Sequence, residues 1–145
     1  MDRRNEVQIF LEQVEKADTI IANKLVEKQQ WHDLALSITA NMNGERVQSS
    51  GAKDKMASAV ERCTDMEGEI DMAVARLVGV KKNVTQTIEQ LYSPTEYDVL
   101  HKRYIQYMRL EEIDEHYKKS DGWAKVTCHR AIKHVQAILN KGARL

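Results

Sequence analysis

Apolar residues recur at alternating three- and four-residue steps along two long stretches of the chain. Neither proline nor glycine occurs between residues 1 and 43. The first stripe consists of Val7, Phe10, Val14, Ala17, Ile21, Lys24, Lys28, Trp31, Ala35, Ile38 and Met42. The second consists of Met56, Ala59, Cys63, Met66, Ile70, Ala73, Leu77, Val80, Val84, Thr87 and Leu91. This sustained spacing is typical of the seam of a coiled coil.

A polar segment, residues 43–51, separates the two stripes. Gly44 can end the first helix in a left-handed cap, and Ser50 or Asp54 can begin the second. Folding the chain back at this segment predicts an antiparallel hairpin in which paired residue numbers add to about 98. Ala35 would then face Cys63.

Two lysines, Lys24 and Lys28, interrupt the first stripe. In the predicted register they lie opposite Ala73 and Ile70, and we expect their aliphatic stems to cover apolar surface while the ammonium groups reach water. Further apolar residues lie off the seam and imply another partner, either a second copy or the C-terminal part of the chain. They include Leu11, Ile20, Leu25, Leu34, Leu36, Val60 and Val74.

The apolar rhythm changes after Pro94, the single proline of the chain. Ser93 or Thr95 can cap a helix there, so we place a domain boundary between residues 92 and 93. Three short apolar groups follow and predict three short helices, with the segment 120–122 supplying the N-cap of the last one. The predicted fold is therefore all-α: a long antiparallel coiled-coil hairpin (1–92) followed by a small three-helix helix-turn-helix unit (93–145).

The charge of the chain is zero overall but uneven. Its 22 basic and 22 acidic side chains cancel, yet residues 117–145 hold seven Lys and Arg against one acid, Asp121. Cys63 and Cys128 are far apart, which suits free thiols in a reducing compartment. Since no apolar run is long enough to span a bilayer and no signal peptide precedes the first stripe, we expect a cytoplasmic protein without a membrane partner.

The last predicted helix has an apolar face and a cationic face. A helix that follows a short turn and presents basic side chains is the usual device for entering the DNA major groove. A solvated helix that merely packs on the hairpin is the alternative. The candidate DNA-binding residues are Lys118, Lys119, Trp123, Lys125, His129, Arg130 and Lys133.

Catalytic and metal-binding patterns are weak in this sequence. Glu112 and His116 share a helical face but lack the HExxH order of a zinc protease. Cys128 and His129 diverge by about 100° on a helix and cannot pair as nucleophile and base. We therefore expect no enzyme activity, no cofactor and no metal.

The C-terminal residues carry a family likeness. They resemble region 4 of bacterial sigma factors in the stretches 97–105, 110–113 and 129–132 and at Ser120, although Asp114 stands where the sigma pattern has a small alanine. The segments 37–44, 47–51 and 54–56 resemble a phage-encoded family of small proteins with the same tail. This resemblance implies a phage or prophage transcriptional regulator akin to the RinA and ArpU late-gene activators.

Partners follow from the same resemblance. It implies double-stranded DNA as the ligand and RNA polymerase as a further candidate partner. From the long hairpin and its off-seam apolar residues we also expect a homo-oligomer, with a dimer favoured. Two other functions stay open: a packaging protein similar to a small terminase subunit, and an adaptor that grips a host protein through the hairpin. The molar mass in solution separates a dimeric regulator from a ring of packaging subunits.

Overall fold

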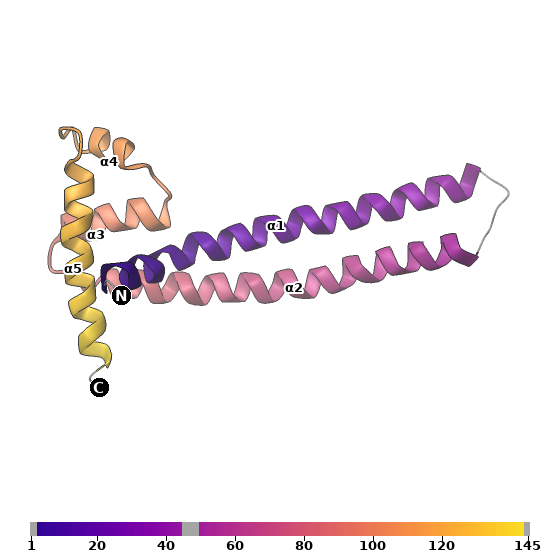
Figure 1. Cartoon of the computed structure of the whole chain (residues 1–145), viewed down its shortest axis with the longest axis horizontal. Helices are drawn as coiled ribbons and strands as arrows, with labels where there is room; N and C mark the ends of the chain where they lie inside the picture. Colours follow the sequence, from indigo (N-terminus) through magenta and orange to yellow (C-terminus); the bar gives the residue numbers. More distant parts are fainter. Residues whose placement is uncertain (1–2, 45–49, 144–145) are drawn as a thin grey trace. The chain divides into compact units, whose positions relative to one another are not determined.

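The described part of the chain consists of helices joined by short turns (Figure 1). The computed structural model describes the backbone of residues 3–44 and 50–143, and the side chains within 6–40 and 51–142. Within these ranges there is no strand. The helices are α1 (Arg3–Gly44), α2 (Ser50–Ile88), α3 (Pro94–Leu100), the π-helical turn η1 (His101–Ile105), α4 (Leu110–His116) and α5 (Trp123–Ala143). The predicted fold, a long helical hairpin with a small helical unit, is confirmed.

Contacts along the chain define two compact units. We call Asp18–Arg76 the arm, and Met1–Ala17 together with Leu77–Leu145 the core unit. Helices α1 and α2 contribute residues to both. Residues 3–17 and 77–88, at the ends of α1 and α2, belong to the same compact unit as α3, α4 and α5. That residues 93–145 fold separately from the hairpin stays a prediction.

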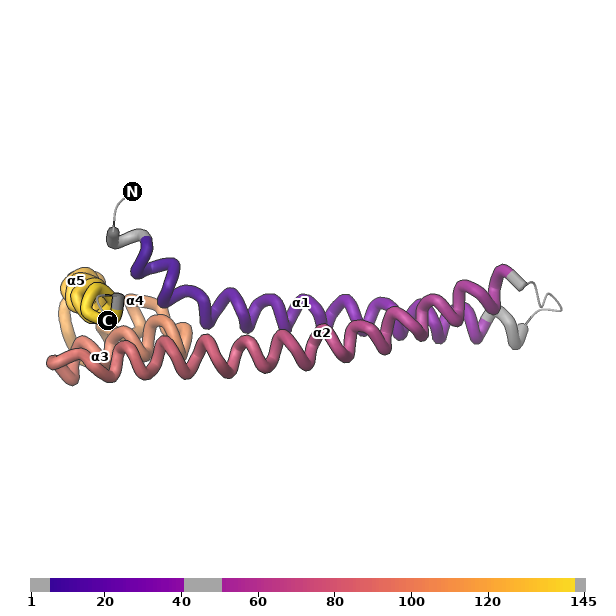
Figure 2. Tube along the Cα trace, turned by 90° about the horizontal axis from the view of Figure 1, so that it is seen from below, coloured from indigo at the N-terminus to yellow at the C-terminus, as the bar shows by residue number. Residues whose placement is uncertain are grey.

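In the arm, α1 and α2 run antiparallel and side by side (Figures 1 and 2). Their predicted stripe residues are less exposed than most residues between them. Two stripe residues of the arm, Ala59 and Met66, are buried. The half-buried ones are Ile21, Lys24, Lys28, Trp31, Ala35, Ile38, Met56, Cys63, Ile70 and Ala73. The three- and four-residue spacing therefore identified the seam correctly.

The register of the arm differs from the predicted one. Cys63 Sγ lies 3.8 Å from the carbonyl oxygen of Lys28, and the Thr39 hydroxyl lies 3.2 Å from the sulfur of Met56. These partner numbers add to 91 and 95, not 98, so the predicted pairing of Ala35 with Cys63 is wrong. Sliding one helix by one or two steps of three or four residues keeps apolar stripe positions together, and the pattern alone therefore left this choice open. Of the predicted connecting segment 43–51, residues 43–44 belong to α1 and residues 50–51 to α2, so the helices extend into this segment from both sides. Residues 45–49 and the side chain of Met42 lie outside the described residues.

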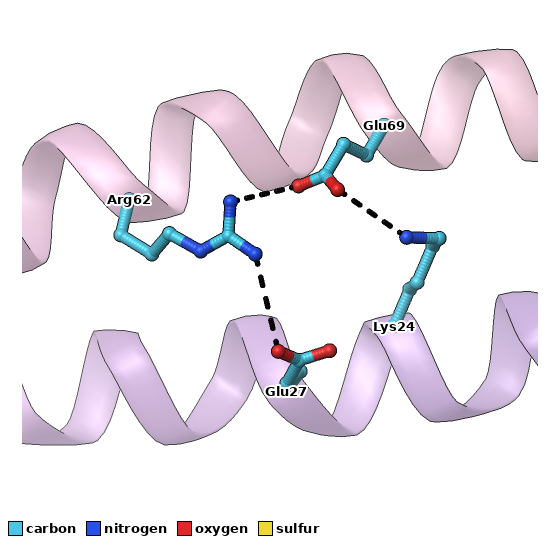
Figure 3. Close-up of polar contacts among 4 residues, drawn as sticks. All are labelled: Lys24, Glu27, Arg62 and Glu69. Carbon is cyan, nitrogen blue, oxygen red and sulfur yellow. Dashed lines mark hydrogen bonds and ion pairs between the residues drawn. The ribbon is translucent and has the colours of Figure 1, made fainter.

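Charged side chains bridge the two helices at the middle of the arm (Figure 3). Lys24 Nζ lies 3.4 Å from a carboxylate oxygen of Glu69, and Arg62 Nη1 lies 3.0 Å from the other. Arg62 Nη2 reaches Glu27 at 3.9 Å. Because these side chains are 27–51% exposed, each ion pair stabilises the folded chain by about 1 kcal/mol at most.

The seam lysines were expected to leave their ammonium groups in water, and the structure adds ion pairs at these groups, with the two lysine side chains 27% and 34% exposed. Lys28 Nζ lies 3.2 Å from Glu67, as Lys24 Nζ lies near Glu69. Both acids belong to α2, so the apolar seam is interrupted by cross-helix ion pairs. Glu67 and Glu69 flank the stripe, and for that reason the stripe alone did not show them as partners.

The core unit buries residues from every one of its helices. Its inner apolar side chains come from α1, α2, α3, η1, α4 and α5 and pack as one cluster. Those with relative exposures of 2% or less are Val7, Leu11, Val14, Val84, Ile88, Val99, Leu100, Ile113, Ala124, Ala131, Ile132 and Val135. The small helices therefore share a hydrophobic core with the ends of the hairpin.

The start of α3 follows the predicted capping pattern. Ser93 is the N-cap, and its hydroxyl oxygen accepts the backbone N–H of Glu96 at 3.3 Å. Pro94 occupies the first turn, where its missing N–H costs nothing. This arrangement places the carboxylate of Glu96 near His134 of α5.

Candidate nucleic-acid interface

Helices α4 and α5 are joined by a tight turn. The backbone N–H groups of Lys118 and Lys119 donate to the carbonyl oxygens of Glu115 and Asp114, at 3.0 and 2.9 Å. Lys118 has a φ of 54°, and Gly122, directly before α5, has a φ of 90°. Two left-handed residues thus turn the chain from one helix into the next, and glycine adopts this conformation without strain at only one of them.

We expect Lys118→Gly to raise the free energy of unfolding by about 0.5–1 kcal/mol, because glycine removes the strain of a left-handed side-chain-bearing residue. Urea denaturation measures this change. Lys119→Gly is the matched control, since Lys119 lacks a positive φ and glycine there should lower stability. Equal losses in both variants would contradict a strained backbone at Lys118.

The first turn of α5 is capped by a side chain from α4. Asp114 is buried, and its Oδ1 accepts the N–H of Ala124 at 2.6 Å while its Oδ2 accepts the N–H of Gly122 at 3.2 Å. The turn itself adds a backbone bond from the N–H of Trp123 to the carbonyl oxygen of Ser120, at 3.2 Å. The sequence pattern had assigned the cap to the segment 120–122, so the role of Asp114 is a finding of the structure.

Helix α5 has one packed face and one open face. Residues on its inner face are buried against the core unit: Ala124, Thr127, Cys128, Ala131, Ile132 and Val135. Six of the seven candidate DNA-binding residues are exposed, and four of these lie on the open face of α5. The six are Lys118, Lys119, Lys125, His129, Arg130 and Lys133. The open face also carries Val126, an exposed apolar side chain between the cations.

Trp123, the seventh candidate, is half-buried and packs within the turn. Its ring centroid lies 4.9 Å from that of Tyr117, and Lys119 Nζ lies 5.8 Å from the centroid of its ring. Such ring and cation–π contacts stabilise the turn. The structure therefore gives Trp123 and Lys119 packing roles beside any contact with a ligand.

Arg130 borders a cleft of about 490 Å³ between α5 and the segment 90–96, which leads into α3. His134, which also borders it, has Nδ1 at 2.9 Å from both carboxylate oxygens of the buried Glu96. Sequence reasoning missed this pair because its members are 38 residues apart. The pair connects α5 to the first turn of α3.

A smaller hollow of about 170 Å³ lies at the side of α5. Arg103, Lys125 and His129 line it together, and Arg103 Nη1 donates to the carbonyl oxygen of Met108 at 3.2 Å. Burial raises the pKa of the Cys128 thiol in this hollow to about 11. The thiol is therefore protonated at neutral pH, and it is a packing group rather than a nucleophile.

Asp98 ties α3 to the end of α4. Its carboxylate accepts hydrogen bonds from Lys102 Nζ at 2.7 and 2.9 Å and from the hydroxyl of Tyr117. Burial opposes ionisation of Asp98, but the hydrogen bonds from Lys102 and Tyr117 outweigh it and hold the pKa of Asp98 below 3.8. Ionised Asp98 thus stabilises the folded chain.

Acid should remove this stabilisation. Because the pKa of Asp98 is lower in the folded chain than in the unfolded one, its contribution is complete above the ordinary value of 3.8 and is lost as the pH falls through the folded pKa. We expect the free energy of unfolding of Asp98→Asn to fall less than that of the wild type as the pH is lowered from about 5 to about 2. Urea denaturation at each pH measures this change. The exposed Asp121→Asn should keep the acid dependence of the wild type. Identical curves for all three proteins would contradict this assignment.

Comparisons with known proteins add no relative: no family model matches the chain, and neither a curated protein nor a solved structure matches it significantly. Across the described helices, none combines the length and apolar character that a bilayer crossing requires. Among the same residues, no three His, Cys, Asp or Glu side chains gather closely enough to hold a metal ion. The site is thus defined by the geometry and charge of the α4–α5 pair.

Proposed function

We propose that this chain is a DNA-binding transcriptional regulator of the phage or prophage type, in which α5 contacts the DNA major groove. The observation that carries the proposal is the open face of α5, where Lys125, His129, Arg130 and Lys133 are exposed while the opposite face is packed. The likeness to region 4 of sigma factors supports it from the sequence. The proposed site of action is the cytoplasm, where the promoter DNA is found.

The dimensions of α5 suit this role. An α-helix with its side chains is about 10–12 Å across, which fits the major groove of B-DNA, about 12 Å wide. The cations from Lys125 to Lys133 extend about 12 Å along the helix at 1.5 Å per residue. Arg and Lys can bind phosphates or guanine edges, and the exposed Val126 can contact a thymine methyl group. The turn lysines Lys118 and Lys119 lie beside the start of the helix and add positive charge there.

A salt titration of duplex affinity tests the proposal. If α5 binds DNA through cationic side chains, the logarithm of the association constant falls linearly with the logarithm of the salt concentration. The slope should be several units, set by the number of phosphates that are neutralised. Absence of binding to promoter-length duplexes at low salt would reject the proposal.

The arm is proposed to hold a second copy or RNA polymerase. Several large apolar side chains of the arm are more than 40% exposed, among them Leu25, Leu36, Val60 and Val74. An adaptor that uses this surface without DNA is the second candidate function, and the same side chains favour it. The molar mass of the free protein, measured together with duplex affinity, distinguishes a dimeric regulator from a packaging ring or a DNA-independent adaptor.

A further inference from the structure

We infer that Asp114 is a positioning residue for the DNA-binding face of α5. The inference rests on the proposed function in taking DNA as the ligand, whereas the contacts of Asp114 are those of the protein without DNA. Asp114 lies in α4, on the far side of the turn from α5, and its carboxylate binds the N–H groups of Gly122 and Ala124. One side chain thus joins the two helices of the helix-turn-helix.

The bonds that Asp114 makes are ones that α5 cannot make for itself. The first N–H groups of any α-helix lack carbonyl partners within the helix. Asp114 accepts two N–H groups at the start of α5, and only 6% of this residue is exposed. Water therefore competes little for the two hydrogen bonds. Because both oxygens are used, the carboxylate constrains the direction in which α5 leaves the turn as well as its distance from α4.

The same carboxylate changes how α5 can attract DNA. A helix N-terminus with unpaired N–H groups is a ready site for phosphate, because its dipole and donors favour an anion. In this chain that position already holds an anion, Asp114. Phosphate binding is therefore assigned to the exposed cations Lys125, Arg130 and Lys133, and the first turn of α5 serves to orient them.

Two substitutions of Asp114 weaken its hydrogen bonds to α5 to different degrees. Asp114→Asn keeps one oxygen that can accept the N–H of Ala124, but its amide group would place a donor against the N–H of Gly122. Asp114→Ala removes both acceptors. We expect faster amide hydrogen exchange at Gly122 and Ala124 in the order wild type, Asn variant, Ala variant, and residual dipolar couplings that show a changed orientation of α5 relative to α4 in the Ala variant.

DNA affinity then separates positioning from direct contact. At a temperature where every variant is folded, we expect Asp114→Ala to weaken duplex binding about tenfold while the slope of the salt dependence stays the same. The comparison variant Lys125→Ala should instead reduce the slope by about one, as the loss of one phosphate contact does. A residue with a purely structural role would change the folded fraction and leave the affinity of the folded protein untouched.

Each outcome decides the inference. Unchanged amide exchange and unchanged orientation of α5 in the Ala variant would overturn it, as would wild-type affinity in that variant. If Asp114→Ala does not fold, the Asn variant decides through the same measurements. If the wild type binds no duplex DNA, the proposed function fails, whereas the exchange and orientation data still show whether Asp114 positions α5.

Discussion

Reversing the charge of Arg130 and Lys133 is expected to weaken binding to duplex DNA by about 100-fold at moderate salt, because two attractive contacts become repulsive. Both side chains are exposed on α5, so Arg130→Glu with Lys133→Glu should leave the core unit folded. Fluorescence anisotropy of labelled promoter fragments measures the affinity. The slope of its salt dependence should fall by about two.

A matched control removes the effect of net charge. Lys53→Glu with Lys55→Glu changes the total charge by the same amount on exposed residues of the arm. We expect it to weaken DNA binding only slightly, since these lysines are not on the open face of α5. Equal losses in the two double variants would mean that DNA responds to the overall charge of the chain, and the assignment of α5 as the DNA-reading helix would then be abandoned.

The helices themselves were predictable because their signals are local. The three- and four-residue apolar spacing located the seam of the arm, and the Ser93-Pro94 pair located the start of α3. The register of the arm was not predictable, because the stripe looks alike after a slide of one or two steps. The contact of Cys63 with Lys28 shows which of these equivalent alignments the chain adopts.

Some features of the candidate site were likewise predictable from the sequence, and others were not. Exposure of Lys125 and Lys133 followed from the helical period, since the apolar residues of α5 define which face is packed. The contacts that hold the site together join distant positions: Asp114 reaches Ala124, and Glu96 reaches His134. A single sequence carries no periodic signal for such pairs, and a buried acid in it looks the same as an exposed one.

The other large effect concerns the core unit. Leu11→Ala is expected to lower the free energy of unfolding by about 3 kcal/mol, within the 2–5 kcal/mol that deletion of a buried leucine side chain typically costs. Leu11 is fully buried, in the same cluster as Ile113 and Val135. The loss should therefore be visible in the unfolding of α4 and α5, which are about a hundred residues further along the chain.

Trp123 supplies the probe, in a Trp31→Phe background that leaves it as the single tryptophan. Its fluorescence during urea denaturation follows the α4–α5 turn, where it packs on Tyr117. Ile9→Ala is the matched control, since Ile9 lies two residues away on α1 but is 57% exposed, and it should change stability by no more than about 0.5 kcal/mol. If Leu11→Ala left the Trp123 transition in place, the helix-turn-helix would fold independently of α1. The boundary predicted at residue 92 would then describe the chain better than a shared core does.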